Sequence, residues 1–358
     1  MSFALQNRYT MANSNKEKLV LVTGGTGFVA GHCIVQLLQN GYKVRTTIRS
    51  LNKKDSVKEM LKNGGITSFE NIDFIEADLT DDKNWAAAVK GCEYVLHVAS
   101  PIFLRLPKHE DEMIVPAVNG TLRILKAARE AGVKRVVITS SFGAVGYSHT
   151  DPHTLITEKE WTNPGDKSLS AYLKSKTMAE KAAWDFMAKE GGNLELTVVN
   201  PMAILGPSLG PGLSSGFELL KKMLDGSMKA TPKIDLGIVD VRDLADLHLR
   251  AMTNPKAKGE RFLALSGGTM SLHEIALLVR EKLGDKAKNV STKIIPDWLI
   301  RVAALFKPEA KAIVPQLGRV RNASNEKAKT VLGWSPRTNE EAVLATAESL
   351  FHYNAVKS

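Results

Sequence analysis

The sequence has little cysteine and lacks a hydrophobic run long enough to cross a membrane. Its two cysteines, Cys33 and Cys92, lie far apart in the chain, which argues against a disulfide framework or a zinc site. We therefore expect a reducing compartment and no bound metal. Residues 1–18 lack the apolar centre of a signal peptide, so we expect a cytoplasmic protein without a membrane partner.

Long blocks of one charge sign are also missing. The 358 residues carry a net charge of +10, but the lysines and arginines are scattered along the chain, and we therefore expect no nucleic-acid partner. A hydrophobic content of 44% and a charged content of 24% exclude the disordered and fibrous classes. The polar residues 1–17 show no periodicity, and we expect a flexible N-terminal tail there.

A glycine-rich turn follows the first apolar run of the chain. A helix is expected over residues 28–40 and a strand over 43–48, which completes a strand, helix and strand unit. Gly24 allows a backbone conformation closed to other residues, and Gly27 lets phosphate oxygens approach. Ala30 in the third position still packs the helix close to the strand. The unit predicts a site for the diphosphate of a dinucleotide; the alternative is a plain structural turn.

Strands and helices continue to alternate after this unit. Further strands are expected at 72–76, 94–98, 135–139 and 194–199, and helices near 81–89, 110–131 and 168–189. Strict alternation indicates a parallel sheet with helices on both faces, so we predict an α/β fold with a Rossmann-type doubly wound sheet. Pro116 falls within one of these helices and is expected to kink it or to delay its start.

The regular alternation ends at Pro201, beyond which Gly-Pro pairs punctuate shorter elements. We expect residues 18–200 to form a dinucleotide-binding Rossmann domain, to which residues 234–265 return. Residues 201–233 and 266–358 are expected to form a smaller C-terminal lobe that binds the substrate.

Three polar residues behind the glycine turn suggest acid–base chemistry. Tyr172 and Lys176 are four residues apart on a predicted helix, hence on one face, and a neighbouring ammonium favours ionisation of a phenol. Ser141 follows a predicted strand at the sheet edge where ligands bind, and its hydroxyl can donate to a carbonyl oxygen. Taken singly, each has a structural alternative: a packed ring, a solvated amine and a turn serine. Their common order behind the glycine turn favours the chemical interpretation.

The end of the second predicted strand indicates which dinucleotide binds. NAD sites present an acidic residue there to the ribose hydroxyls, whereas a 2′-phosphate requires a cation. Arg49 occupies this place, Lys53 and Lys54 follow, and no acid occurs before Asp55. The pattern predicts NADP (NADPH) as the cofactor; the alternative is that Arg49 is merely a solvated residue at a strand end.

Short motifs stand in order along the chain. They are Thr23-Gly24-x-x-Gly27-x-x-Ala30, Ala77-Asp78-Leu79, His97-Val98-Ala99-Ser100, Thr139-Ser140-Ser141, Tyr172-Leu173-Lys174-Ser175-Lys176, Asn200-Pro201 with Gly206-Pro207, and Leu332-Gly333-Trp334-Ser335-Pro336. Together they resemble the extended short-chain dehydrogenase/reductases, most closely the branch of dihydroflavonol reductases and microbial aldehyde and ketone (carbonyl) reductases. The resemblance runs from about residue 18 to residue 350.

The resemblance implies roles for individual residues. Tyr172 would be the general acid, Ser141 would orient the carbonyl oxygen, and Lys176 would bind the nicotinamide ribose and lower the tyrosine pKa. Asp78 would contact adenine, although a local turn carboxylate is the alternative. The residues implied in cofactor binding are Thr23, Gly24, Thr26, Gly27, Phe28, Val29, Arg49, Lys54, Asp78, Leu79, Val98, Ala99, Ser100, Tyr172, Lys176, Pro201 and Ala203.

The substrate is less clearly marked. Plant dihydroflavonol reductases carry an asparagine that holds the flavonoid ring, and this chain has Gly146 at the corresponding place, which argues against a flavonoid. Four apolar residues are expected to line the substrate pocket, namely Ile102, Phe103, Phe142 and Met202; core packing is the alternative for each. No cluster of arginine or lysine suggests a clamp for a carboxylate or diphosphate.

We therefore predict an NADPH-dependent oxidoreductase that reduces an aldehyde or ketone to the alcohol. The alternatives are a nucleotide-sugar epimerase or dehydratase, a hydroxysteroid dehydrogenase, and a redox-sensing regulator that binds NADP without catalysis. The Tyr172 and Lys176 pair argues against the regulator, and a homodimer remains open.

Overall fold

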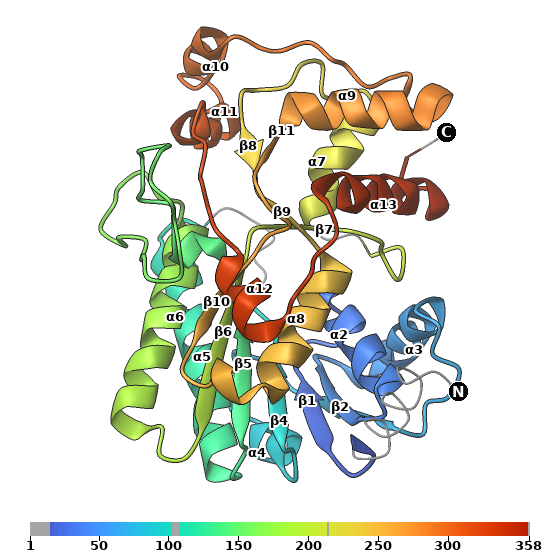
Figure 1. The fold of residues 1–358 in the computed structure, drawn as a ribbon, viewed down its shortest axis with the longest axis vertical. Coiled ribbons are helices and arrows are strands. Elements are labelled where there is room, and N and C mark those ends of the chain that lie inside the picture. The colour runs from blue at the N-terminus through green and yellow to red at the C-terminus, as the bar shows by residue number, and fades with distance from the viewer. Residues whose placement is uncertain (1–14, 102–106, 213–214, 357–358) are drawn as a thin grey trace.

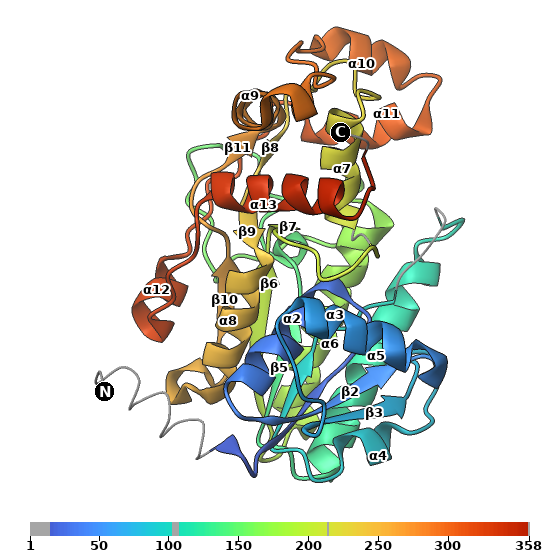
Figure 2. The same ribbon diagram turned by 90° about the vertical axis from the view of Figure 1, so that its right-hand side faces the viewer.

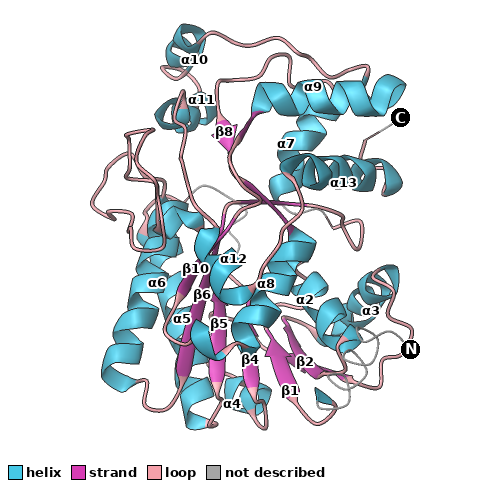
Figure 3. Ribbon diagram, viewed as in Figure 1, coloured by secondary structure: helices cyan, strands magenta, loops and turns pink. Residues whose placement is uncertain are grey.

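The computed structural model describes residues 15–101, 107–212 and 215–356. Within them, parallel strands form a seven-stranded sheet in the order β10-β6-β5-β4-β1-β2-β3 (Figure 3). The strands are β1 (Leu19–Val22), β2 (Lys43–Ile48), β3 (Ile72–Glu76), β4 (Tyr94–His97), β5 (Arg135–Thr139), β6 (Glu195–Pro201) and β10 (Arg261–Ala264). The strand order reverses between β1 and β4, where open α/β sheets bind ligands. The predicted Rossmann-type fold is confirmed.

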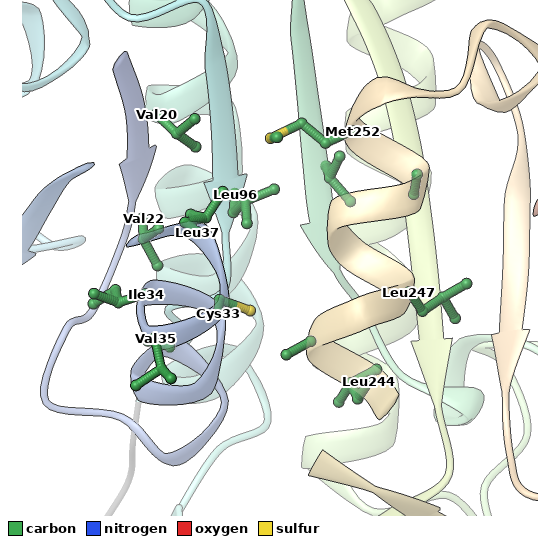
Figure 4. Close-up of a cluster of buried hydrophobic side chains, with 14 of the residues drawn as sticks. Val20, Val22, Cys33, Ile34, Val35, Leu37, Leu96, Leu244, Leu247 and Met252 are labelled. Carbon is green, nitrogen blue, oxygen red and sulfur yellow. The ribbon is translucent and has the colours of Figure 1, made fainter. Parts of the chain in front are cut away.

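Helices cover both faces of this sheet (Figure 1). One face carries α2 (Phe28–Gln39), α3 (Lys54–Asn63), α8 (Val241–Thr253) and α12 (Glu326–Leu332), and the other carries α4 (Trp85–Val89), α5 (Asp111–Glu130) and α6 (Ala171–Glu190). Figure 4 shows the first of these cores, in which Leu37 of α2 and Leu244 of α8 flank Leu96 of β4. Burial on both faces explains why the strands read as continuous apolar runs.

Beyond β6 the chain builds a third apolar cluster at one end of the sheet (Figures 1 and 2). Two small sheets lie there, one pairing β7 (Ala203–Leu205) with β9 (Ile238–Asp240) and the other β8 (Asp235–Leu236) with β11 (Met270–Ser271). The helices of this part are α7 (Ser215–Leu224), α9 (Leu272–Leu283), α10 (Asp297–Ala303), α11 (Pro308–Ile313) and α13 (Asn339–His352). The core of the cluster joins α7, α9 and α13.

Residues 234–265 contain elements of the small sheets as well as of the large one. That segment forms β8 and β9 of the small sheets, whereas α8 covers the large sheet and β10 extends its edge by pairing with β6. The domain boundaries at residues 200, 233 and 265 stay predictions.

Pro116 does not delay the start of α5. The helix begins at Asp111 and runs through the proline to Glu130. A proline removes one helical hydrogen bond, here to the carbonyl of Glu112. Glu112 is exposed, so water can reach that carbonyl and the loss is tolerated.

The described chain begins just before β1. Asn15, within the segment expected as a flexible tail, is buried and its Nδ2 donates to the Asn40 carbonyl at 3.2 Å; residues 1–14 lie outside the described residues. No helix of the described part combines the length and apolarity that crossing a bilayer requires. Cys33 and Cys92 are buried and unpaired.

Candidate active site

A cleft of about 790 Å³ opens where the strands of the large sheet end. Its lining includes residues one or two positions beyond the ends of β1, β2, β3, β4, β5 and β6, together with the start of α6 and parts of β7 and β8. The structure brings together most of the residues that the sequence singled out. Those that line the cleft are Gly24, Thr26, Gly27, Phe28, Val29, Arg49, Asp78, Leu79, Val98, Ala99, Ser100, Ser141, Phe142, Tyr172, Pro201, Met202 and Ala203.

The glycine turn forms one end of the cleft. Gly24 has a positive φ of 75°, and a Cβ atom there would lie 2.9 Å from the Cβ of Ala99, so only glycine fits. The Gly24 N–H donates to the hydroxyl of Thr47 at 2.9 Å, which fixes the turn against β2. Helix α2 begins directly after Gly27, and the N–H groups of its first turn have no partner within the helix. The turn therefore offers positive dipoles to an anion in the cleft.

Thr23 lies behind this turn and does not line the cleft. Its hydroxyl accepts hydrogen bonds from the N–H groups of Val98 and Ala99 at 3.1 and 3.0 Å, and lies 3.0 Å from Nδ1 of His97. Thr23 thus ties the end of β1 to the end of β4. Thr23 therefore supports the glycine turn from behind and does not line the cleft.

Arg49 and Asp78 line the cleft just after β2 and β3. Arg49 is exposed at the end of β2, and no ion pair among the described residues includes it. The Asp78 carboxylate accepts from the N–H and hydroxyl of Thr80 at 2.8 and 2.7 Å, and these bonds, with a smaller contribution from Arg49, lower its pKa. Lys54 does not line the cleft, because its Nζ lies 5.5 Å from the centre of the Phe74 ring.

Ser141 and Tyr172 face the cleft from β5 and α6. The Ser141 Oγ accepts from the Gly143 N–H at 3.0 Å and so caps the short turn that follows β5. Tyr172 is the second residue of α6, which Ser170 caps, and it is 48% exposed. Shielding from water nevertheless raises the pKa of its phenol above the usual value of 10, while Ser141 acts in the opposite direction. Tyr172 is therefore a neutral phenol that can donate a proton.

Lys176 lies one helical turn beyond Tyr172, and its ammonium is bound to Ser100. Its Nζ donates to the Ser100 Oγ at 3.0 Å and lies 5.9 Å from the centre of the Tyr172 ring. Burial lowers the pKa of Lys176 to about 8, against the opposing effect of Glu180. The pKa of Tyr172 is raised by shielding from water, and the effect that opposes this shift comes from Ser141. The lowering of the tyrosine pKa by Lys176 stays a prediction.

Lys176 also lines a second cavity of about 30 Å³ behind the cleft, which is large enough for ordered water. His97, Ser140 and Glu180 contribute polar groups to its wall. Burial lowers the pKa of His97 to about 3, so its imidazole is neutral.

Glu180 anchors α6 to three strands. Its side chain is buried, and it accepts from Arg261 Nε of β10 at 2.6 Å, from Asn200 Nδ2 of β6 at 2.7 Å and from the Ser140 hydroxyl at the end of β5. The sequence analysis missed this residue, although its spacing of four from Lys176 places it on the same face of the helix.

Phe142 and Met202 line the cleft, in the part that we call its apolar end; that they bind the substrate stays a prediction. The predicted residues Ile102 and Phe103 lie outside the described residues. A Cβ atom on Gly146 would come within 2.3 Å of the Phe142 ring, so an asparagine at this position would require the ring to move. The sequence argument against a flavonoid stays a prediction.

The cleft also contains residues that the sequence analysis did not name. They include Tyr147, Ile204, Asp235, Leu236, Gly237 and Arg321. The Tyr147 ring centre lies 6.0 Å from that of Phe142, and the Arg321 guanidinium stacks on Tyr147. Tyr147 and Arg321 come from loops far apart in the chain and show no helical or strand periodicity, so no local pattern could have marked them.

Comparisons with known proteins agree with this geometry. A model of the NAD dependent epimerase/dehydratase family matches residues 20–264. An uncharacterized oxidoreductase of Schizosaccharomyces pombe is 33% identical, over 93% of this chain and 97% of that protein. Cinnamoyl-CoA reductase 1 of Arabidopsis thaliana is 37% identical, over 70% of this chain and 71% of that protein.

Solved structures are similar as well. The crystal structure of yeast methylglyoxal/isovaleraldehyde reductase Gre2 complexed with NADPH superimposes with a TM-score of 0.77 at 26% identity, covering 94% of this chain and 99% of that one. The similarity therefore extends over the large sheet and the elements that follow β6.

Proposed function

The chain belongs to the NAD dependent epimerase/dehydratase family, the extended short-chain dehydrogenase/reductases, and from this premise we propose that it reduces an aldehyde or ketone to the alcohol with Tyr172 as proton donor. It is an NADP-dependent oxidoreductase, as the sequence predicted, and its relatives include NADPH-dependent reductases. We also place it in the cytoplasm, where its two buried, unpaired cysteines would stay reduced.

We expect NADPH to bind in the cleft, which contains the glycine turn, Arg49, Ser141 and Tyr172. The first turn of α2 would hold the diphosphate, because its N–H groups have no partner within the helix. Gly24 leaves this turn without a side chain, since a Cβ atom there would collide with Ala99. Arg49 would bind the 2′-phosphate, because it is exposed beside the cleft and pairs with no acid among the described residues. Lys176 would reach the nicotinamide ribose from its place beside Ser100. When bound, NADPH supplies the hydride.

The protein residues would orient the carbonyl and supply the proton. Ser141 would donate its hydroxyl hydrogen to the carbonyl oxygen, which aligns the bond to be reduced and stabilises the charge that develops on the oxygen. Tyr172 would then transfer its phenolic proton to that oxygen, a role that its raised pKa suits at neutral pH. Phe142 and Met202 would pack against an apolar part of the substrate and exclude water.

One observation carries the proposal: Ser141 and Tyr172 face the same cleft that the glycine turn and Arg49 form at its other end. A proton donor, an oxygen-binding hydroxyl and a dinucleotide site thus share one continuous space.

The test is NADPH consumption by the purified protein with a panel of aldehydes, α-ketoesters, aryl ketones and dihydroflavonols. We expect turnover with aldehydes or ketones of apolar body and none with dihydroflavonols. If no carbonyl compound is reduced while NADPH still binds, the reductase assignment is wrong.

A further inference from the structure

Arg321 is a buried cation at the apolar end of the active-site cleft. The residue is 7% exposed and lines the cleft together with Tyr147 and Tyr172. Its guanidinium stacks on the Tyr147 ring, with Cζ 4.0 Å from the ring centre, and one of its amino groups, Nη2, donates to Gln316 Oε1 at 2.7 Å. Stacking and this single hydrogen bond fix the plane of the guanidinium.

The remaining donors of Arg321 lack partners among the described residues. Nε is buried and finds no acceptor there, and no described carboxylate lies within ion-pair distance of the side chain. Asp235 lines the same cleft but makes no ion pair with it, and the neighbouring Arg319 adds a second positive charge. A guanidinium without a counterion is costly to bury. A ligand that brings an anionic group into the cleft would offset this cost.

The charge balance of the cleft limits what that group can be. At this end of the cleft Arg321 is the one cationic side chain among the described lining residues, and Asp235 contributes a carboxyl group. A diphosphate, as in a nucleotide sugar, carries more negative charge than one guanidinium can balance beside an acid. A carboxylate carries a single charge and matches the two-pronged geometry of a guanidinium.

We propose that Arg321 binds a carboxylate of the substrate, so that the compound reduced is an oxo acid whose carbonyl lies between Ser141 and Tyr172. This inference rests on the proposed function and adds the substrate class. The Tyr147 ring lies under the guanidinium, and Tyr147, Tyr172 and Arg321 line the same cleft. An apolar chain between the carbonyl and the carboxylate would span the space between these groups, and Phe142 and Met202 can accompany it.

The test compares ω-oxo carboxylates of increasing chain length with their methyl esters, which differ only in charge. In the wild-type protein, kcat/KM for the best acid should exceed that of its ester by at least about tenfold, since charged hydrogen bonds are lost in the ester. Arg321→Gln should reduce this ratio about 10- to 100-fold by slowing the acid while leaving the ester nearly unchanged. Arg321→Lys should restore part of the preference. Arg319→Gln, which removes a neighbouring charge outside the cleft, is the matched control and should keep the wild-type ratio.

Each outcome decides between the proposals. Equal turnover of acid and ester by the wild-type protein overturns the carboxylate site while the reductase function stands, and this result does not depend on whether any variant folds. An unchanged ratio in a folded Arg321→Gln variant overturns it as well. Tight inhibition by a nucleoside diphosphate sugar that is lost in Arg321→Gln would assign the guanidinium to a phosphate instead. If neither acids nor esters nor the wider carbonyl panel are reduced, the proposed function fails and this inference with it.

Discussion

Lys176 on α6 and Ser100 after β4 are joined by a hydrogen bond of 3.0 Å that holds the ammonium beside the cleft. The bond holds the lysine against the segment that follows β4, at the point where the strand order reverses between β1 and β4. Binding of the cofactor ribose, more than tuning of the tyrosine, is thus the role that this geometry favours for Lys176.

A pH dependence follows from the environment of Lys176. Burial lowers the pKa of this lysine to about 8, so the ammonium is present below that pH and is lost above it. The value of kcat/KM for NADPH, which reports the free enzyme, should therefore fall as the pH rises through about 8.

The carboxylate of Glu180 should determine the pH at which kcat/KM for NADPH falls, which we call the alkaline limb of the profile. Its carboxylate raises the pKa of Lys176, so Glu180→Gln should move the limb to lower pH. Ser140→Ala removes a hydrogen bond to Glu180 but keeps the charge, and its profile should stay near that of the wild type. Identical profiles for both variants and the wild type would show that Glu180 has no electrostatic influence on the lysine.

Removal of the proposed proton donor should affect turnover and not binding. Tyr172→Phe is expected to lower kcat by about 10² to 10⁴-fold, the usual contribution of a general acid, with NADPH affinity within about twofold of the wild type. Steady-state kinetics and a fluorescence titration of NADPH measure the two quantities. Retention of wild-type kcat would exclude Tyr172 as the acid.

Cofactor preference should depend on Arg49. Because this exposed guanidinium lines the cleft without a described acidic partner, Arg49→Asp should lower the ratio of kcat/KM for NADPH over NADH by about 10- to 100-fold. Lys54→Ala is the comparison, since its ammonium lies over Phe74 and not in the cleft. A larger loss of preference in Lys54→Ala than in Arg49→Asp would assign the phosphate to the lysine.

The glycine turn offers a test of steric fit. Gly24 and Gly91 have the same φ of 75°, but only at Gly24 would a Cβ atom meet a neighbour, Ala99. Alanine at either position should destabilise the fold by about 1–2 kcal/mol through backbone strain. NADPH affinity should fall at least about tenfold in Gly24→Ala alone. Thermal denaturation and NADPH titration distinguish the two effects, and equal affinities in both variants would contradict a diphosphate at this turn.

The alternation of strands and helices in the large sheet was predictable from the sequence. Strands β2, β3 and β5 fall where they were predicted. Four of the five residues of β5 are buried, and a strand buried on both faces leaves a local composition signal. Helix α13 was missed, although Thr338 and Glu341 form the capping box that announces its start. That motif is short and becomes persuasive only beside an apolar stripe.

The site was predictable only where a motif is contiguous. The glycine turn, Tyr172 and Lys176 each belong to a local pattern, and the fold brings them to the edges of one cleft and its neighbouring cavity. Arg321 and Tyr147 meet through a tertiary stacking contact that no spacing in the chain records. Lys54 is the opposite case. Its charge suggested a phosphate partner, but its ammonium lies over the Phe74 ring and not in the cleft.

The bond between Glu180 and Arg261 spans 81 residues of sequence, and this separation affects how the protein is made. The glycine turn, Ser141, Tyr172 and Lys176 all leave the ribosome before the guanidinium that neutralises the buried carboxylate beneath them. A nascent chain stopped short of residue 261 would contain Ser141, Tyr172 and Lys176, yet its α6 would carry a buried carboxylate without the guanidinium that neutralises it. The charge balance of the helix bearing Tyr172 and Lys176 is thus completed only when β10 has been synthesised.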